Sequence, residues 1–398
     1  MTQDKKVIAV IFGSVSVEHD VSILTGLQIF EAIDSTQYMP IPIYIDQNGQ
    51  WYSGDELLNR KNYHFSQNIK DKLHKISLKI CSNHNLRPFF EIENNSFFKK
   101  KNKIFFDVAF LALHGGAGEN GQIQGLLSML NIPFTGTDHF TSSIFMNKSL
   151  TKKILKDHNI SVLNDQIIKK PKSLSKKNIL SEINLKFPLC VKPCNLGSSV
   201  AVSKVMNEDD LFEALLTIFQ IDDMALIEPF VENLVEYNIS ITKCLSDKIE
   251  LSAIEKPIKN DNLLCFKDKY LNDGNDFDNK LQSPFSQGMA SSSREINPKL
   301  SKKNEKFIKD SAIKLMEIFN FNGAPRIDFL SDEKSDEIWF NEVNPLPGSL
   351  GYYLWENADN PTSFTILLSA LIEQANNLSK KNNIHNLKSL KANIFPQN

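Results

Sequence analysis

Short apolar runs that alternate with amphipathic stretches make up most of the chain. Residues 7–12 form a continuous apolar run, which predicts a buried strand, and a loop beginning at Gly13 leads into an amphipathic helix. Residues 38–44 predict a second strand, and residues 105–113 predict another buried strand. Strands that alternate with helices are typical of a doubly wound α/β domain, in which ligands bind beyond the carboxyl ends of the strands.

Two loops of this first domain carry polar candidates. The strand at 105–113 leads into HGGAGENGQIQG, whose glycines allow a tight turn before a helix that begins at Gln122. His114 and these glycines are also compatible with a turn that binds no ligand. Glu18, at the start of the first helix, is compatible with a carboxylate that only complements the helix dipole. Residues 47–103 lack a clear period, and we expect them to form a peripheral extension.

A lysine inside an apolar strand distinguishes residues 187–202, FPLCVKPCNLGSSVAV. We expect a strand that carries Lys192, then a loop of small residues at 195–199, then a second strand. Main-chain N–H groups of such a loop can converge on an anion, and a lysine adds positive charge for a phosphate. A surface hairpin with a snorkelling lysine explains the small residues but not the apolar neighbours of Lys192. The sequence favours a phosphate-binding loop that is not a P-loop.

Two glutamates accompany the next predicted strands. Residues 225–230 predict a strand that contains Glu228, and Glu236 precedes a strand that begins at Tyr237. A strand beside a nucleotide can bind adenine through its backbone, while a carboxylate binds the ribose hydroxyls. A solvated charge at a strand end is the alternative for either glutamate.

A long polar segment without a clear period spans residues 261–293 and includes Lys269 and Tyr270. A loop of this length within a compact domain is usually functional or disordered, and an active-site lid is the functional version. An amphipathic helix is expected at 364–375, followed by a Lys/Asn-rich tail that we expect to be partly disordered.

Ligand-type side chains alternate along two short apolar strands in GAPRIDFLSDEKSDEIWFNEVNPLPG, which follows an amphipathic helix at 298–319. Residues two apart in a strand face the same side, so Arg326 points with Asp328, and Glu342 points with Asn344. A turn between the strands brings both pairs to one place. Oxygen ligands of this kind suit a hard cation such as Mg²⁺. A solvated polar face is the alternative, and the Pro-rich loop directly afterwards favours a functional site.

Size and composition predict a globular protein of several domains. We place the domains of the 398-residue chain at 1–146, 147–236 and 237–375, with a polar tail at 376–398. A net charge of −2 argues against nucleic acid or an anionic membrane as the main partner. The chain has no apolar run of transmembrane length and no signal-peptide segment, so we expect a cytoplasmic protein. Its five scattered cysteines fit reduced thiols.

Taken together, these stretches resemble the D-alanine–D-alanine ligases of the ATP-grasp superfamily. The resemblance covers roughly residues 7–375, and its motifs recur in the order that the family has. The matching pieces are FGSVSVEHDVS at 12–22, HGGAGENGQIQG at 114–125, KPCNLGSSV at 192–200, KDKYLND at 267–273, and RIDF with NEVNPLPG in the hairpin. Each piece is moderately specific, and all five in sequence are strong support.

The resemblance implies an ATP-grasp fold, with an N-terminal Rossmann-like domain followed by two α+β domains that enclose ATP. It also implies ATP-dependent joining of two D-alanine molecules for peptidoglycan, through a D-alanyl phosphate. Two Mg²⁺ ions, or Mn²⁺, would accompany ATP. A homodimer formed through the first domain is implied as well.

The same resemblance implies residue roles. The catalytic residues would be Glu18, Ser199, Tyr270 and Arg326. The nucleotide would be held by Lys148, Lys192, Ser198, Ser199, Glu228, Phe230, Val231, Glu236 and Lys269. The amino acid substrates would contact Glu18, His114, Gly348, Ser349 and Leu350, and the metal ligands would be Asp328, Glu342 and Asn344. Glu18 would bind the first ammonium group, Arg326 would stabilise an oxyanion, and Ser199 or its neighbour would link Glu18 to the lid.

Several positions depart from the family pattern. Asn120 and Asn147 replace the aspartates of the usual GEDG and M-D-K, and Pro325 precedes the arginine. The family normally has a Thr-Ser segment before the Ser-Leu that helps to hold the second D-alanine, whereas here SLGYYLWE follows directly at 349–356. Two alternatives therefore stay open: a ligase with D-lactate, D-serine or another acceptor, and a non-catalytic nucleotide-binding homologue.

Overall fold

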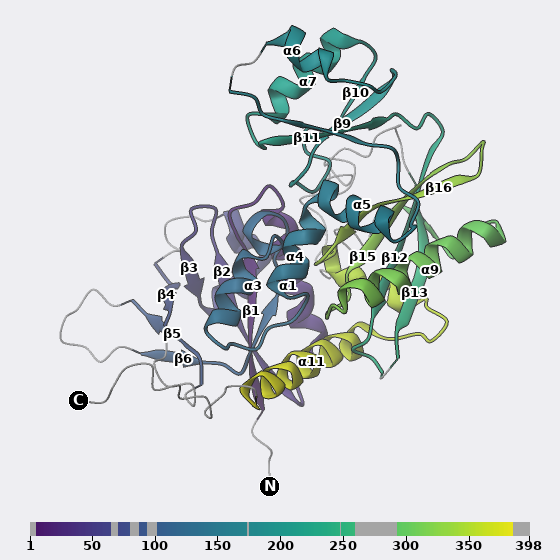
Figure 1. Cartoon of the computed structure of the whole chain (residues 1–398). Coiled ribbons are helices and arrows are strands. Elements are labelled where there is room, and N and C mark those ends of the chain that lie inside the picture. Colours follow the sequence, from purple (N-terminus) through teal and green to yellow (C-terminus); the bar gives the residue numbers. More distant parts are fainter. Residues whose placement is uncertain are drawn as a thin grey trace, which may run out of the picture.

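Three β-sheets with helices packed against them make up the protein, seen here in a computed structural model (Figure 1). The first sheet lies among the purple and blue helices, the second forms a smaller teal lobe, and the third lies beside the green helix α9 (Lys302–Phe319). The structure describes residues 5–64, 71–79, 87–93, 102–172, 175–246, 248–258 and 293–384. Lys269, Tyr270 and all but the last residue of the predicted lid lie outside the described residues.

The first sheet has seven strands in the order β6-β5-β4-β3-β2-β1-β7. Its parallel strands are β1 (Lys6–Gly13), β2 (Tyr38–Ile45) and β7 (Val108–Leu111). The antiparallel strands are β3 (Trp51–Ser53), β4 (His74–Leu78), β5 (Phe89–Ile92) and β6 (Lys103–Phe105). The parallel part and its antiparallel addition confirm the predicted α/β domain with a peripheral extension.

The prediction of one strand at residues 105–113 is wrong, because the chain turns between β6 and β7. Asp107, between the two strands, accepts a hydrogen bond from the backbone N–H of Val7 at 2.7 Å and pairs with Arg87 at 2.7 Å. The two strands stand at opposite ends of the strand order although only Phe106 and Asp107 separate them. The antiparallel extension therefore curls back toward β7.

The C-terminal helix α11 (Phe364–Ile384) returns to the first domain. It packs against β7 and against α1 (His19–Ala32), and Figure 1 shows it along the base of that domain. Leu367 and Leu368 belong to the same apolar core as the residues of β1. The expectation of disorder directly after residue 375 is therefore wrong as far as Ile384, because the helix continues there.

The second sheet is antiparallel and forms the small lobe. Its strands, in the order β10-β9-β11-β8, are β8 (Gln166–Lys169), β9 (Leu189–Pro193), β10 (Ser203–Val205) and β11 (Met224–Pro229). Helices α6 (Lys176–Ser181) and α7 (Glu208–Ile218) share an apolar core with it. The strand after Lys192 starts at Ser203, later than expected, because Ser198, Ser199 and Ala201 have positive φ angles.

The third sheet carries the predicted hairpin. Its strands, in the order β14-β13-β12-β15-β16, are β12 (Leu234–Thr242), β13 (Glu250–Pro257), β14 (Arg294–Ile296), β15 (Arg326–Asp332) and β16 (Glu337–Asn344). Glu236 lies within β12 and not before it, because pairing with β15 begins at Leu234. Helices α5 (Lys148–Asp157) and α9 contribute to the apolar core of this sheet, and α4 (His139–Met146) links it to the first domain.

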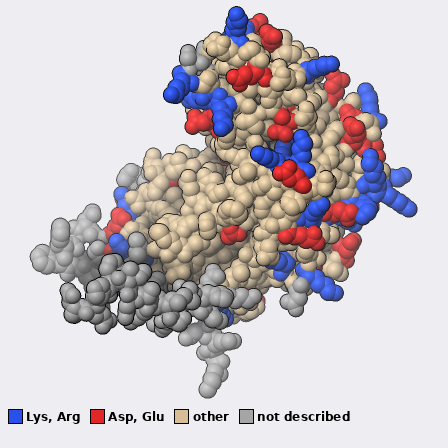
Figure 2. Space-filling model, viewed as in Figure 1, with Lys and Arg blue, Asp and Glu red and all other residues tan. Residues whose placement is uncertain are grey.

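On the face of the molecule that Figure 2 shows, the charged side chains form no large patch of one sign. Figure 2 shows basic and acidic side chains interspersed over the visible face, in agreement with the small net charge of −2. Within the described part of the chain, no helix is long and apolar enough to span a bilayer.

Gly26 fixes how closely α1 lies on β1. A Cβ atom at this position would lie 2.7 Å from the ring carbon Cγ of Phe12. We therefore expect Gly26→Ala to lower the free energy of unfolding by about 1–3 kcal/mol in denaturant titrations, since overpacking outweighs the gain in helix propensity.

Gly125 in α3 (Gln122–Met129) provides a matched control. A Cβ atom there would meet only His139 Cβ, at 3.8 Å. Gly125→Ala should leave stability unchanged or raise it by up to about 1 kcal/mol. Equal effects of the two substitutions would contradict the packing argument.

Candidate active site

The β15–β16 hairpin places four predicted ligand residues on one face. Arg326 lies opposite Asn344, and Asp328 lies opposite Glu342 in the strand register. Directly opposed residues of antiparallel strands share a face, as the alternation along each strand predicted. The register shifts between Asp328 and Phe329, where Phe329 pairs with Phe340, so Asn341 is an extra residue in β16.

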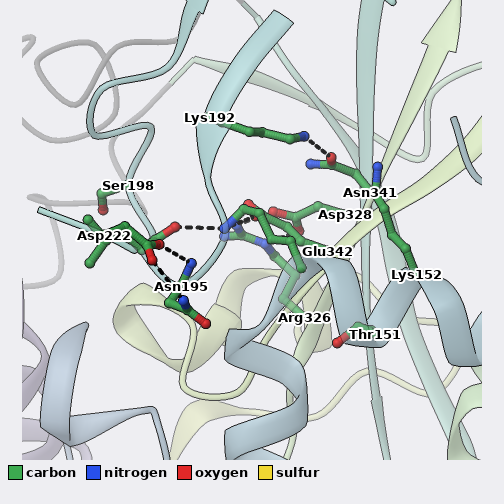
Figure 3. A network of polar contacts seen from close by, with 12 residues as sticks. Thr151, Lys152, Lys192, Asn195, Ser198, Asp222, Arg326, Asp328, Asn341 and Glu342 are labelled. Atoms are coloured by element: carbon green, nitrogen blue, oxygen red, sulfur yellow. Dashed lines mark hydrogen bonds and ion pairs between the residues drawn. The ribbon is translucent and has the colours of Figure 1, made fainter. Parts of the chain in front are cut away.

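This β-bulge connects the third sheet to the second. The side-chain oxygen of Asn341 accepts a hydrogen bond from Lys192 Nζ at 3.1 Å. Figure 3 shows the two side chains pointing toward each other, with Arg326, Asp328 and Glu342 nearby. A bulge redirects a side chain next to a site in this way. This hydrogen bond holds Lys192 near Asp328 and Glu342, two of the predicted metal ligands.

Opposite charges on this face are paired with each other. The guanidinium group of Arg326 donates to both carboxylate oxygens of Asp328, at 2.7 and 2.8 Å. Burial acts to lower the pKa of Arg326, but the adjacent Asp328 more than offsets this and raises that pKa well above its usual value. Lys148, at the start of α5, pairs with Glu342 at 2.9 Å and donates to the carbonyl oxygen of Leu196 at 2.7 Å.

A buried carboxylate between two lysines lies beside these pairs. Glu228, whose side chain is 1% exposed, forms ion pairs with Lys152 and, at 2.7 Å, with Lys192. Burial and the neighbouring Lys192 lower the pKa of Lys152, and burial lowers the pKa of Lys192. Two lysines share one carboxylate here, so a phosphate that binds beside them would provide a second anionic partner.

The loop after β9 reaches the first domain. Ser198 Oγ donates a hydrogen bond to Glu18, just before α1, and both side chains are buried. Gly115 lies so close to Glu18 that an added Cβ atom would stand 2.4 Å from a carboxylate oxygen. Ser198 and Ser199 have φ angles of 53° and 55°. The observed link to Glu18 comes from Ser198, the neighbour of the predicted Ser199.

A second buried carboxylate, Glu119, accompanies Glu18. Its Oε2 accepts a hydrogen bond from the backbone N–H of Gly115 at 2.8 Å. With its amide nitrogen turned toward these acceptors, Asn344 donates to Glu119 Oε1 at 3.0 Å and to the carbonyl of Leu346 at 3.2 Å. Burial and the charge of Glu18 raise the pKa of Glu119 well above its usual range.

His114 ties the loop after β16 to the first domain. Its Nδ1 donates to the carbonyl oxygen of Leu346 at 2.7 Å, so its Nε2 accepts from the Thr25 hydroxyl, also at 2.7 Å. Thr25 in turn accepts a hydrogen bond from the backbone N–H of Ser349 at 3.1 Å. Ser349 and Leu350 both have positive φ, near 50°. This chain of hydrogen bonds fixes a strained loop beside Glu18.

Both halves of the chain match known protein families. A family model described as the D-ala D-ala ligase N-terminus matches residues 7–137, and one described as the C-terminus matches residues 154–373. The D-alanine–D-alanine ligase of Thermosipho melanesiensis is 33% identical over 361 residues, which cover 88% of this chain and 89% of that relative. The chain belongs to the D-alanine–D-alanine ligase family.

Solved structures agree with this membership. The D-alanine–D-alanine ligase from Helicobacter pylori has a TM-score of 0.69 at 28% identity, covering 92% of this chain and 98% of that one. The VanG D-Ala:D-Ser ligase from Enterococcus faecalis has a TM-score of 0.70 at 24% identity, covering 94% and 100%, and shows the fold alone. The predicted ATP-grasp architecture is therefore confirmed.

The cleft between the sheets brings together six of the predicted site residues. A narrow pocket of about 40 Å³ is lined by groups from all three parts of the chain, among them Glu18, Lys148, Ser198, Arg326, Glu342 and Asn344. Phe230 and Val231 follow β11, where Phe230 N–H donates to the carbonyl of Pro188 at 3.0 Å. Among the described residues, no three His, Cys, Asp or Glu side chains form a metal-type cluster. The metal assignment of Asp328, Glu342 and Asn344 thus stays a prediction.

Sequence reasoning missed Lys152, Glu119 and Asn341. Lys152 follows Lys148 by four residues on α5, and this spacing puts both on one helix face. This spacing could have identified Lys152 as a site residue from the sequence. Nothing in the local sequence marks Asn341 as the bulged residue or Glu119 as buried, because both depend on contacts with distant segments.

The pKa of His114 predicts a dependence of stability on pH. Burial lowers this pKa to about 4 from the ordinary 6.5, so only the unfolded chain takes up a proton between these pH values. The contribution of neutral His114 is therefore complete above pH 6.5 and is lost as the pH falls toward 4. Between pH 7 and pH 5, the free energy of unfolding should fall by about 2 kcal/mol more in the wild type than in His114→Gln.

Denaturant titrations at the two pH values measure this difference. The exposed His139 offers a matched control, and His139→Gln should retain the pH dependence of the wild type. An equally steep loss of stability in His114→Gln would contradict the assignment of a neutral, buried His114.

Proposed function

We propose that this chain is a ligase that uses ATP to join two D-alanine molecules into D-alanyl-D-alanine for peptidoglycan. The observation that carries the proposal is the meeting of Arg326, Asp328, Glu342 and two lysines beside Glu18, on elements of three sheets. Phosphoryl transfer chiefly needs charge neutralisation and positioning, which these groups supply. Membership of the ligase family gives independent support.

In the first step, the carboxylate of one D-alanine attacks the γ-phosphorus of ATP, and ADP leaves. The product is D-alanyl phosphate. Lys148 and Lys192 exchange their pairs with Glu342 and Asn341 for phosphate oxygens. The loop with Ser198 closes over the phosphates with its main-chain N–H groups. The phosphate also becomes a second anionic partner for the two lysines that share Glu228.

In the second step, the amine of the other D-alanine attacks the acyl carbon. The carbonyl oxygen becomes an oxyanion, the amine loses a proton, and inorganic phosphate leaves as the amide forms. Arg326 donates to the oxyanion, since its guanidinium is buried and permanently charged. Glu18 holds the ammonium group of the first D-alanine, and the loop of Gly348, Ser349 and Leu350 contacts the second.

Asp328, Glu342 and Asn344 would hold Mg²⁺, because they offer only oxygen ligands on one face, two of them directly opposed. When bound, the ions neutralise charge on the phosphate oxygens. The amide of Asn344 can turn its nitrogen toward Glu119 and Leu346, which leaves its oxygen as the ligand atom. Two ions, or Mn²⁺ in their place, fit the same donor set.

Adenine would bind beside the backbone of Phe230 and Val231, and its ribose would bind Glu236. Glu228 also anchors the two lysines in this account. Lys269 and Tyr270 would cover the site from the lid. This activity belongs in the cytoplasm, where ATP is available.

A homodimer formed through the first domain is part of the proposal. Met129 on α3 and Phe140 on α4 are 70% and 66% exposed, and the partly exposed Leu126 lies on the same helix as Met129. Apolar side chains that a described surface leaves open in this way suit contact with a second copy.

Incubation with ATP and D-alanine tests the proposed reaction. We expect one phosphate released per D-alanyl-D-alanine formed, with both products absent when D-alanine is omitted. Mass analysis with a panel of acceptors identifies the second substrate. A D-lactate or D-serine product in place of the dipeptide would overturn the acceptor assignment, and phosphate release independent of D-alanine would overturn the ligase assignment.

Arg326 has the most sharply defined role. Arg326→Ala should lower kcat by roughly 100-fold or more, the scale of a lost oxyanion donor, while nucleotide affinity measured by calorimetry changes little. Arg326→Lys keeps the charge but lacks the planar fork that binds Asp328, so it should also be impaired. Near-normal turnover in both variants would contradict this role.

A further inference from the structure

A row of polar residues extends the metal-type ligands across the third sheet. Glu255 on β13 lies opposite Asn238 on β12, which lies opposite Asp328 on β15, which lies opposite Glu342 on β16. Directly opposed residues share a face, so all four side chains stand on the side that carries Arg326. The first two have no role in the reaction described above.

Glu255 is a buried carboxylate with fixed partners. It is 1% exposed and accepts hydrogen bonds from Arg294 at 2.8 Å and from Asn238 Nδ2 at 2.9 Å. The Tyr353 hydroxyl lies 3.4 Å from the same carboxylate, and the guanidinium group of Arg294 stacks 3.8 Å from the Tyr353 ring. A carboxylate held on several sides cannot swing away, so its position on this face of the sheet is fixed.

Two buried acceptors beside Arg326 have no hydrogen-bond donor among the described residues. They are Asn238 Oδ1 and Ser240 Oγ, and Ser240 lies directly opposite Arg326 in the register. Both residues are at least nine-tenths buried. An unpaired buried acceptor costs on the order of 1–3 kcal/mol, so two of them side by side call for an explanation.

Charge balance supplies that explanation. Arg326 is paired with Asp328, yet the proposed function, on which this inference rests, gives Asp328 to Mg²⁺. Once a cation binds Asp328, Arg326 loses its counter-ion and needs other acceptors close by. Glu255 stands on the same face of the sheet, on the strand that pairs with the neighbour of Arg326's strand.

We propose that Glu255, Asn238 and Ser240 form a second binding position for Arg326, called here the seat. The guanidinium group occupies this position when Asp328 binds metal. Asn238 and Ser240 accept its hydrogen bonds, and Glu255 supplies the negative charge behind them. All three are positioning residues, since they act through Arg326. The seat frees Asp328 for the metal and keeps Arg326 directed at the reacting carbonyl.

The affinity for metal tests the proposed position of Arg326, and it can be measured without catalytic turnover. Without Glu255, Arg326 depends more strongly on Asp328 as a counter-ion and competes with the metal for it. Mn²⁺ binding in the presence of a non-hydrolysable ATP analogue, followed by electron paramagnetic resonance, should be roughly 5- to 10-fold weaker in Glu255→Gln. The kcat should fall by roughly 10-fold or more, with the KM for ATP nearly unchanged.

Glu295→Gln is the matched control, because it makes the same change on an exposed carboxylate of the adjacent strand β14. It should leave both measurements unchanged. Ser240→Ala distinguishes loss of the proposed hydrogen-bond acceptor from a general loss of folding. Removal of an unpartnered hydroxyl should not lower the unfolding temperature, yet it should weaken Mn²⁺ binding and lower kcat several-fold.

Wild-type Mn²⁺ affinity in both Glu255→Gln and Ser240→Ala would overturn the proposal, whatever their turnover. Failure of the wild type to consume ATP with D-alanine would instead overturn the proposed function. The metal titration separates the two outcomes, since it does not require turnover.

Discussion

The pairing of buried opposite charges on neighbouring strands is the constraint on which the rest of the site depends. Arg326 and Asp328 lie in a protein interior, where an unpaired ion is costly, so each holds the other in place. The register of β15 with β16 then aligns Glu342 and Asn344 with them. Lys148 neutralises Glu342, and Glu228 balances Lys152 and Lys192 in the same manner. A ligand must exchange these internal partners for its own charges.

The same polar contacts hold the three sheets together around the cleft. Asn341 joins the third sheet to Lys192 of the second, and Ser198 joins the second to Glu18 of the first. The hydrogen bonds of His114 and Thr25 link the first domain to the loop after β16. The contacts that hold the three sheets together and the candidate site therefore belong to one network of polar side chains.

Sequence periodicity was sufficient where local pattern decides the structure. Alternation along the hairpin gave the shared face of Arg326, Asp328, Glu342 and Asn344, and an apolar strand marked Lys192 as unusual. Sequence periodicity failed where contacts between distant segments determine the structure. The bulge at Asn341, the burial of Glu119 and the acceptors beside Arg326 arise from strand register and from packing between domains, which no short stretch of sequence encodes. The break between β6 and β7 was missed for the same reason, since Asp107 turns the chain through contacts with Val7 and Arg87.

A crystal structure with Mg²⁺, ADP and a phosphorylated D-alanine analogue tests the central claim most directly. The exchange of partners predicts metal–oxygen distances of about 2.0–2.1 Å to Asp328 and Glu342. It also predicts that Lys148 has moved from Glu342 to a phosphate oxygen. A structure with nucleotide bound, the Arg326–Asp328 and Lys148–Glu342 pairs intact and the metal elsewhere would contradict the account.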